Sequence, residues 1–134
     1  MERLSGGCLC GAFRYETVLP TESATLCHCR SCQKAHGTHA VAWYTVPAGA
    51  FQCVGDAMVE RQSSAGRWRG YCGSCHSPIT YRSADRRGEI DVTVASLDHP
   101  DRLRPADHIH MSDAIGWDRP ADGLPCFPGT RSSS

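Results

Sequence analysis

The sequence predicts a single, mainly β domain with one short helix, and two observations lead to this prediction. First, short runs rich in β-branched and aromatic residues recur along the 134-residue chain, separated by Gly, Pro, Ser and Asp, whereas helical periodicity is scarce. Second, the chain shows neither internal repeats nor a linker that would divide it, and its length is that of one ordinary domain.

The predicted elements follow one another closely along the chain. The run "HAVAWYTVP" (39–47) is apolar enough to be a buried strand. Good helix formers followed by Gly37 predict one or two helical turns at 29–37, directly after a cluster of cysteines. From Pro100 onward the sequence predicts mostly loop, ending in a flexible tail at 128–134. The expected strands are 12–18, 24–29, 39–47, 50–55, 58–64, 67–72, 78–83 and 88–97.

Charge and hydropathy limit the partners of the chain. The formal net charge is zero, so bulk electrostatics favours neither nucleic acid nor an anionic membrane. No stretch approaches the roughly 20 apolar residues of a membrane helix, and the start, "MERLSGGCLCGAF", lacks the apolar core of a secretion signal. A cytoplasmic location is therefore expected. Seven of the nine cysteines fall in close-set groups, and in a reducing compartment such groups indicate metal ligands rather than disulfides.

Two cysteine pairs, far apart in the sequence, form the first candidate metal site. "CLC" supplies Cys8 and Cys10, and "CGSC" supplies Cys72 and Cys75; these four residues are called the tetrad. Structural zinc prefers a closed tetrahedral shell of thiolate and imidazole ligands. The tetrad is therefore predicted to hold a structural zinc that contributes folding free energy directly. The alternative, a redox pair in "CGSC", needs a helix opening after a strand, and here Pro78 and "ITYRS" follow instead.

The motif "CHCRSC" supplies three more cysteines, Cys27, Cys29 and Cys32, called the trio. Three protein ligands with an exchangeable fourth position are the pattern of a catalytic zinc, and a soft thiolate from a substrate suits that position. The opposite interpretation is a closed site. Spacing alone supports the open and the closed site about equally. The candidates for a fourth ligand are His36, four residues after Cys32, and then His28, His39, Cys53 and Cys126.

These motifs together resemble a known family. The segments "GGCLCGAFRY", "CHCRSC", "YCGSCHSPI", "ASLDHP", "HIHMSDAIGW" and "GLPCFPG", in this order, are similar to those of the glutathione-dependent formaldehyde-activating enzymes, whose wider group includes a centromere-associated protein. The resemblance covers residues 5–127 and implies a zinc-stapled β-tent fold. It also implies two zinc ions per chain: a structural zinc on Cys8, Cys10, Cys72 and Cys75, and a second zinc, available for catalysis, on Cys27, Cys29 and Cys32.

The resemblance implies an activity as well. The family joins formaldehyde to glutathione to give S-hydroxymethylglutathione, a carbon–sulfur lyase reaction in reverse. The chain is thus expected to be a zinc-dependent carbon–sulfur lyase-type enzyme acting on a thiol adduct, with a small-molecule thiol such as glutathione as its partner. Arg30 is the arginine nearest to the trio in the sequence and a candidate anchor for a glutathione carboxylate. The alternative function is a non-catalytic, zinc-stabilised protein-binding module, for which a closed or empty trio site is expected.

Two positions depart from the family pattern. His76 stands where the family usually has glycine, directly after the second cysteine pair, and glycine there would allow a positive φ. His36 stands where a small residue is expected before Gly37. If His36 closed the metal site of the trio, catalysis through an open position would be lost.

Overall fold

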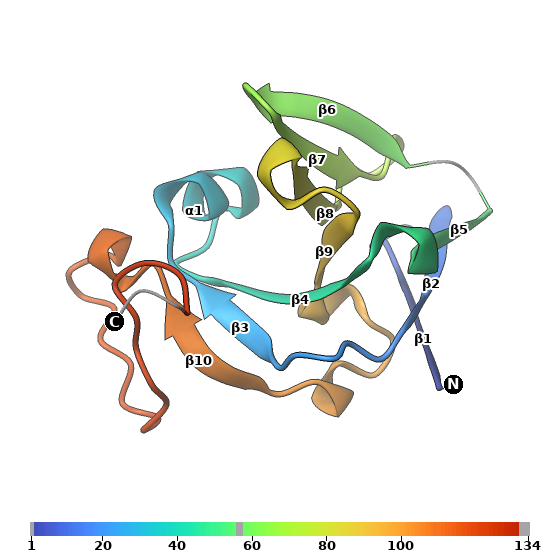
Figure 1. Ribbon diagram of the computed structural model, residues 1–134. Coiled ribbons are helices and arrows are strands. Elements are labelled where there is room, and N and C mark those ends of the chain that lie inside the picture. The colour runs from blue at the N-terminus through green and yellow to red at the C-terminus, as the bar shows by residue number, and fades with distance from the viewer. Residues whose placement is uncertain (1, 56–57, 132–134) are drawn as a thin grey trace.

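The computed structural model describes residues 2–55 and 58–131, and it confirms a mainly β fold with one short α-helix, which begins within the trio rather than after it (Figure 1). The α-helix is α1 (Arg30–His36), and short 3-10 helices lie at Ala48–Ala50, Ala84–Arg86, Val94–Ser96, Pro100–Arg102 and Met111–Asp113. None of the helices in the two described ranges combines the length and the apolar character needed to cross a bilayer. The strands are β1 (Arg3–Gly7), β2 (Phe13–Val18), β3 (Ala24–Cys27), β4 (Val41–Pro47), β5 (Gln52–Gly55), β6 (Val59–Ser64), β7 (Arg67–Tyr71), β8 (Pro78–Ser83), β9 (Glu89–Thr93) and β10 (Pro105–Ile109).

Within the described ranges these strands form two sheets. The smaller sheet has the order β1-β2-β5 and is antiparallel. The larger sheet has the order β10-β3-β4-β9-β8-β7-β6, with β10 parallel to β3 and the other pairs antiparallel. The β6–β7 hairpin therefore occupies one end of the larger sheet and β10 the other (Figure 1).

The main core consists of apolar side chains from both sheets. Phe13 and Tyr15 of β2 pack with residues of β4, β8 and β9, and each is only 1% exposed. Two buried hydroxyls next to this core, those of Thr17 and Tyr44, pair with each other at 3.0 Å. A second, smaller cluster contains Cys27 and Cys32 of the trio together with Val41 and Trp43. The trio is thus built into apolar packing rather than carried on a loose loop.

The helix begins and ends where the sequence predicts. Cys29 is its N-cap, with a β-region backbone and a sulfur that accepts a hydrogen bond from the amide of Cys32 at 3.3 Å. Gly37 ends it in the left-handed conformation, at φ 63°, and its amide donates to the carbonyl of Gln33 at 2.8 Å. A cysteine N-cap directs its sulfur at the first turn of the helix, and this places Cys29 beside Cys32.

Two strands were not expected from the sequence. β1 contains Ser5, Gly6 and Gly7, which have low strand propensity, yet it pairs with β2 over its whole length. β10 is a strand within the chain after Pro100, which is otherwise mostly loop as predicted. Its inward residues Asp107 and His108 are polar, so the apolar alternation that signals a strand is missing.

The end of the described chain packs against β10. The guanidinium of Arg131 donates to the carboxylate of Asp107 at 2.6 Å and to the carbonyl of Ser23 at 2.6 Å. The predicted flexible tail spans 128–134, and residues 132–134 lie outside the described residues. Residues up to Arg131 therefore help to cover the β3–β10 end of the larger sheet.

Candidate metal centres

The structure brings the tetrad together. Cys8 and Cys10 follow β1, and Cys72 and Cys75 lie between β7 and β8. All four sulfurs lie within 4.8 Å of one another. The Cys8–Cys10 and Cys10–Cys72 sulfur pairs are 3.6 and 3.8 Å apart, close to the about 3.8 Å expected between two ligands of a tetrahedral zinc with Zn–S bonds of about 2.3 Å. The tetrad therefore fits a closed four-thiolate zinc shell.

Within the tetrad, hydrogen bonds favour the thiolate form of Cys8 and of Cys75. The amide of Phe13 donates to the sulfur of Cys8 at 3.3 Å, and the amide of Cys75 donates to the sulfur of Cys72 at 3.5 Å. The hydroxyl of Ser77 lies 3.0 Å from the sulfur of Cys75, and this hydrogen bond lowers the pKa of the Cys75 thiol to about 5. Thiolates are the metal-binding form of cysteine, so the loop is prepared for a metal.

His76 adopts the conformation that a glycine would favour at this position. Its φ is 65°, and its amide donates to the carbonyl of Cys72 at 2.8 Å, which closes the turn around the tetrad. A left-handed conformation in a residue with a Cβ costs about 1–2 kcal/mol. The turn therefore keeps its shape despite the departure from the family pattern, and the histidine carries backbone strain.

The trio also comes together, at the junction of β3 and α1. Cys27 ends β3, Cys29 is the N-cap of α1, and Cys32 lies in its first turn. The three sulfurs lie within 4.8 Å of one another, and the sulfurs of Cys27 and Cys32 are 3.7 Å apart. Cys27 and Cys32 are buried, whereas Cys29 is partly exposed. Hydrogen bonds from the Cys27 and Cys32 thiols lower the pKa of Cys29 well below its ordinary value.

No fourth side chain joins the trio. Among the described His, Cys, Asp and Glu residues, none places a ligand atom within 4.8 Å of all three sulfurs. The ring of His36, the first candidate for closing the site, packs edge-on against Trp43 at a centroid distance of 5.2 Å. The side chain of Cys53 is exposed on β5 of the smaller sheet, and Cys126 is also exposed. The trio is therefore a three-thiol cluster with an open fourth side.

The two remaining candidate histidines belong to a polar network beside the trio. The ring of His28 contacts His108 at 2.9 Å and Asp118 at 3.3 Å. His39 contacts the same Asp118 carboxylate at 2.8 Å, and His108 in turn contacts Asp122 at 2.8 Å. Both ring nitrogens of His28 thus face His108 and Asp118 rather than the trio sulfurs, and the network connects the trio turn to the chain after β10.

Some neighbours of the trio could not be found in the sequence. Tyr81 of β8 packs on the cluster that holds Cys27, Cys32 and Trp43. The guanidinium of Arg69, on β7, lies 4.9 Å from the centroid of the Tyr81 ring. Their position depends on the register of the β7–β8 hairpin, which pairs Arg69 with Tyr81. Arg30, the expected anchor, instead directs its guanidinium at the side chain of Gln33.

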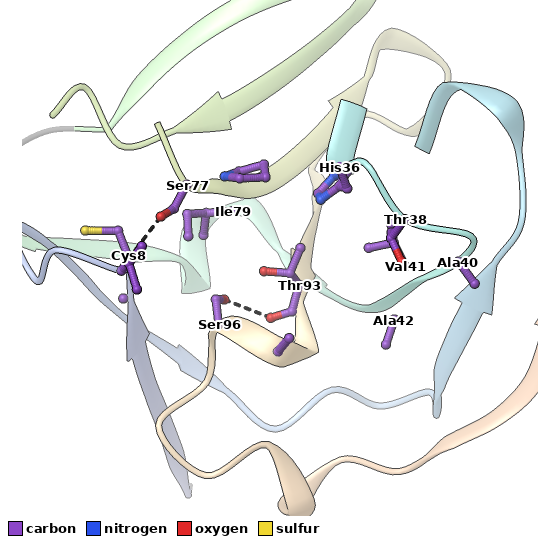
Figure 2. A pocket seen from close by; sticks show the side chains of 14 residues that line it. Cys8, His36, Thr38, Ala40, Val41, Ala42, Ser77, Ile79, Thr93 and Ser96 are labelled. Carbon is purple, nitrogen blue, oxygen red and sulfur yellow. Dashed lines mark hydrogen bonds between the residues drawn. The ribbon is translucent and has the colours of Figure 1, made fainter. Parts of the chain in front are cut away.

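A pocket of about 660 Å³ lies between the tetrad and the helix (Figure 2). Its wall on one side includes Cys8 and Ser77, and on the other side His36 at the end of α1. Thr93 and Ser96 form a further part of the wall. No trio sulfur lines the pocket, but His36 stands one helical turn beyond Cys32. The volume is that of an ordinary small-molecule site.

Together these features define a class: a mainly β domain that carries one complete four-thiol cluster and one open three-thiol cluster, both able to hold a metal. The family model described as "Glutathione-dependent formaldehyde-activating enzyme" matches residues 3–113, and the chain belongs to this family. The expected resemblance is thereby confirmed.

The comparison with solved structures supports the fold. The crystal structure of a Rhodobacter sphaeroides protein is similar, with a TM-score of 0.60 and 22% sequence identity over 71% of this chain and 88% of that chain. At this identity the likeness concerns the fold alone. No curated protein matches the chain.

Proposed function

We propose that this chain is a zinc-dependent carbon–sulfur lyase-type enzyme that acts on a thiol adduct, with S-hydroxymethylglutathione as the adduct and glutathione as the thiol. One observation carries the proposal: the tetrad offers a complete ligand shell, whereas the trio offers three thiols and an open fourth side. Membership of the family supplies the reaction class. The tetrad then holds a structural zinc and the trio a second zinc, two per chain.

The chemistry of the trio suits this role. Soft thiolate ligands select zinc over magnesium or calcium, and three of them leave room for one more sulfur. The zinc would lower the pKa of a bound thiol, so that sulfur is held as a nucleophilic thiolate at neutral pH. Burial of Cys27 and Cys32 keeps solvent from two sides of the cluster, and the partly exposed Cys29 marks the side on which a substrate can approach.

The proposed reaction is an addition without net redox change. The thiol of glutathione loses its proton, its sulfur forms a bond to the carbon of formaldehyde, and the carbonyl oxygen takes up a proton to become a hydroxyl. In the lyase direction the same carbon–sulfur bond breaks. The free thiols also suit a reducing compartment, because none of the nine cysteines is in a disulfide, and this supports a cytoplasmic location.

Native mass spectrometry before and after addition of glutathione tests the open site. The expected result is two zinc ions and one bound glutathione per chain, with the glutathione and one zinc lost in Cys29→Ser. Cys126→Ser is the matched control, since Cys126 is exposed and outside both clusters, and it should behave as the unmodified chain does. Two zinc ions with no bound glutathione would contradict the proposal and favour a protein-binding module.

The rate of the reaction needs its own test, because formaldehyde and thiols combine without a catalyst. NMR exchange spectroscopy measures the interconversion of glutathione and S-hydroxymethylglutathione at equilibrium. The zinc-loaded chain should raise the exchange rate above that of the buffer alone, and Cys29→Ser should return it to that level. If glutathione binds but the exchange rate equals the uncatalysed rate, the chain is a thiol-binding protein and the proposed catalytic activity is refuted.

A further inference from the structure

Three buried polar groups near the trio have no hydrogen-bond partner. Among the described residues, four buried side-chain atoms lack a hydrogen bond; one of them, His28 Nδ1, lies 3.3 Å from the Asp118 carboxylate, and the other three are His36 Nε2, Arg69 Nη1 and Thr93 Oγ1. Leaving such an atom unpaired costs about 1–3 kcal/mol, and more for a charged group. Three groups left in this state in one region indicate that something absent from the chain itself pairs with them.

Arg69 is the most demanding of the three because it carries a charge. Its guanidinium forms no ion pair with any carboxylate among the described residues, whereas Arg82, one strand away, makes a two-pronged contact with Glu60 at 2.6 and 2.7 Å. One face of the Arg69 guanidinium is covered by the ring of Tyr81. This leaves Nη1 of Arg69, on a guanidinium that stacks against Tyr81, unpaired and suited to an acid group that the chain does not supply.

The position of Arg69 is next to the trio. Tyr81, on which it stacks, packs on the cluster that contains Cys27 and Cys32. His36 is close enough to Arg69 for the two to interact electrostatically. Burial is the main cause that lowers the pKa of His36 to about 4, and the positive charge of Arg69 is the second. His36 is therefore a neutral imidazole at pH 7, and its unpaired Nε2 can donate a hydrogen bond without adding charge. It also lines the pocket, as does Thr93 (Figure 2).

We propose that Arg69, with His36 beside it, is the binding site for a carboxylate of the thiol substrate, so that the open trio selects acid-bearing thiols over neutral ones. The inference rests on the proposed function, since it assumes that the trio takes the sulfur of the substrate. Arg69 replaces Arg30 as the anchor, because the guanidinium of Arg30 already contacts Gln33. Guanidinium donors match a carboxylate in pairs, and such charge-assisted contacts are stronger than neutral ones.

The proposal is tested with pairs of thiols, in which one member has a free carboxylate and the other has the same carboxylate as an ester. The part of the ligand that carries the sulfur is the same in both. The chain is loaded with Co²⁺, whose absorption reports a new thiolate ligand, and is titrated with 3-mercaptopropionate and with its methyl ester. Glutathione and its diethyl ester form a second pair with a longer reach. In at least one pair the acid should bind about tenfold more tightly than the ester at pH 7. Equal affinities of acid and ester in both pairs would overturn the inference.

Arg69→Gln should abolish this preference and leave the affinity for the ester unchanged. Arg61→Gln is the matched control, because Arg61 faces Arg69 across the β6–β7 pair and is exposed; it should keep the preference. If Arg69 only balances the charge of the trio, Arg69→Gln will weaken Co²⁺, acid and ester alike, and the proposal is wrong. Should Arg69→Gln fail to fold, the comparison of acid and ester in the unmodified chain still decides.

The two proposals fail in different ways. If acid and ester both change the cobalt spectrum with equal affinity, the trio takes thiols and only the carboxylate site is wrong. If no thiol changes the spectrum, the open-site function itself is wrong, and the carboxylate inference falls with it.

Discussion

Replacing Gly6 by alanine tests how β1 is held against the rest of the fold. A Cβ at this position would lie 2.5 Å from the backbone oxygen of Ser96, 2.5 Å from the hydroxyl oxygen of Tyr15 and 2.6 Å from its Cζ. Ordinary carbon contacts are about 3.5–4.0 Å, so the neighbours must move by about 1 Å. Tyr15 is 1% exposed and hydrogen-bonded to the Ser96 side chain at 2.6 Å, so it has little room to move.

The expected loss of stability follows from these contacts. Overpacking a filled site costs about 1–3 kcal/mol, and disturbing the Tyr15–Ser96 hydrogen bond adds about 1 kcal/mol. Gly6→Ala should therefore lower the free energy of unfolding by about 2–4 kcal/mol. Urea denaturation of the zinc-loaded chain, followed by circular dichroism, measures this as a lower midpoint at an unchanged slope.

Two further variants make the measurement decisive. Gly49→Ala is the control, since no atom lies within 4 Å of its added Cβ, and it should change stability by less than about 0.5 kcal/mol. Adding Tyr15→Phe to Gly6→Ala should recover only part of the loss, because the Ser96 backbone oxygen remains in place. If Gly6→Ala is no less stable than Gly49→Ala, the close approach of β1 to Tyr15 and Ser96 is refuted.

Three other predictions follow from features of the two clusters and the surface. His76→Gly should raise the free energy of unfolding by up to about 1.6 kcal/mol, because it relieves about 1–2 kcal/mol of backbone strain, while the greater freedom of the unfolded chain costs about 0.4–1 kcal/mol; a lower free energy of unfolding in urea denaturation would contradict this. The Arg14 hydrogen bond holds the pKa of Asp98 below its usual range, so this pair stabilises the fold fully above about pH 4 and less as the pH falls through the lower folded value. The pair is half-exposed and contributes at most about 1 kcal/mol, and Arg14→Gln should raise the pKa of Asp98 in an NMR titration; an unchanged pKa would refute the pairing. A chelator should remove zinc in two kinetic phases of one ion each, the faster phase from the trio, and Cys29→Ser should lack the fast phase. Release of both zinc ions in a single phase would contradict the prediction that the two sites hold zinc differently.

Local sequence signals predicted the helix and which cysteine sulfurs lie together, whereas the metal that each group is expected to hold stays a prediction. Gly37 ends α1 in the left-handed conformation that its position after the helix formers indicated. The grouping of Cys8 and Cys10 with Cys72 and Cys75 is what the structure shows for their sulfurs. These predictions succeed because capping and ligand spacing are local, or depend on chemistry that few other residues share.

Features that depend on distant pairing were beyond the sequence. β10 is held through its polar side chains, for example where the Thr25 hydroxyl donates to the Asp107 carboxylate at 2.5 Å, so no apolar alternation marks it. The choice between an open and a closed trio depended on the direction of the His36 ring, which Trp43 of β4 fixes. The place of Arg69 depended on the register of two hairpins.

The tetrad also changes what the unfolded chain can do. Its sulfurs connect Cys10 and Cys72, which are 62 positions apart, and a metal held between them would close a loop of that length. By analogy with a disulfide, such a cross-link removes about 4 kcal/mol of chain entropy from the unfolded state for as long as the metal stays bound. Unlike a disulfide, this link requires reduced thiols, and the free zinc concentration, rather than an oxidant, decides whether it forms.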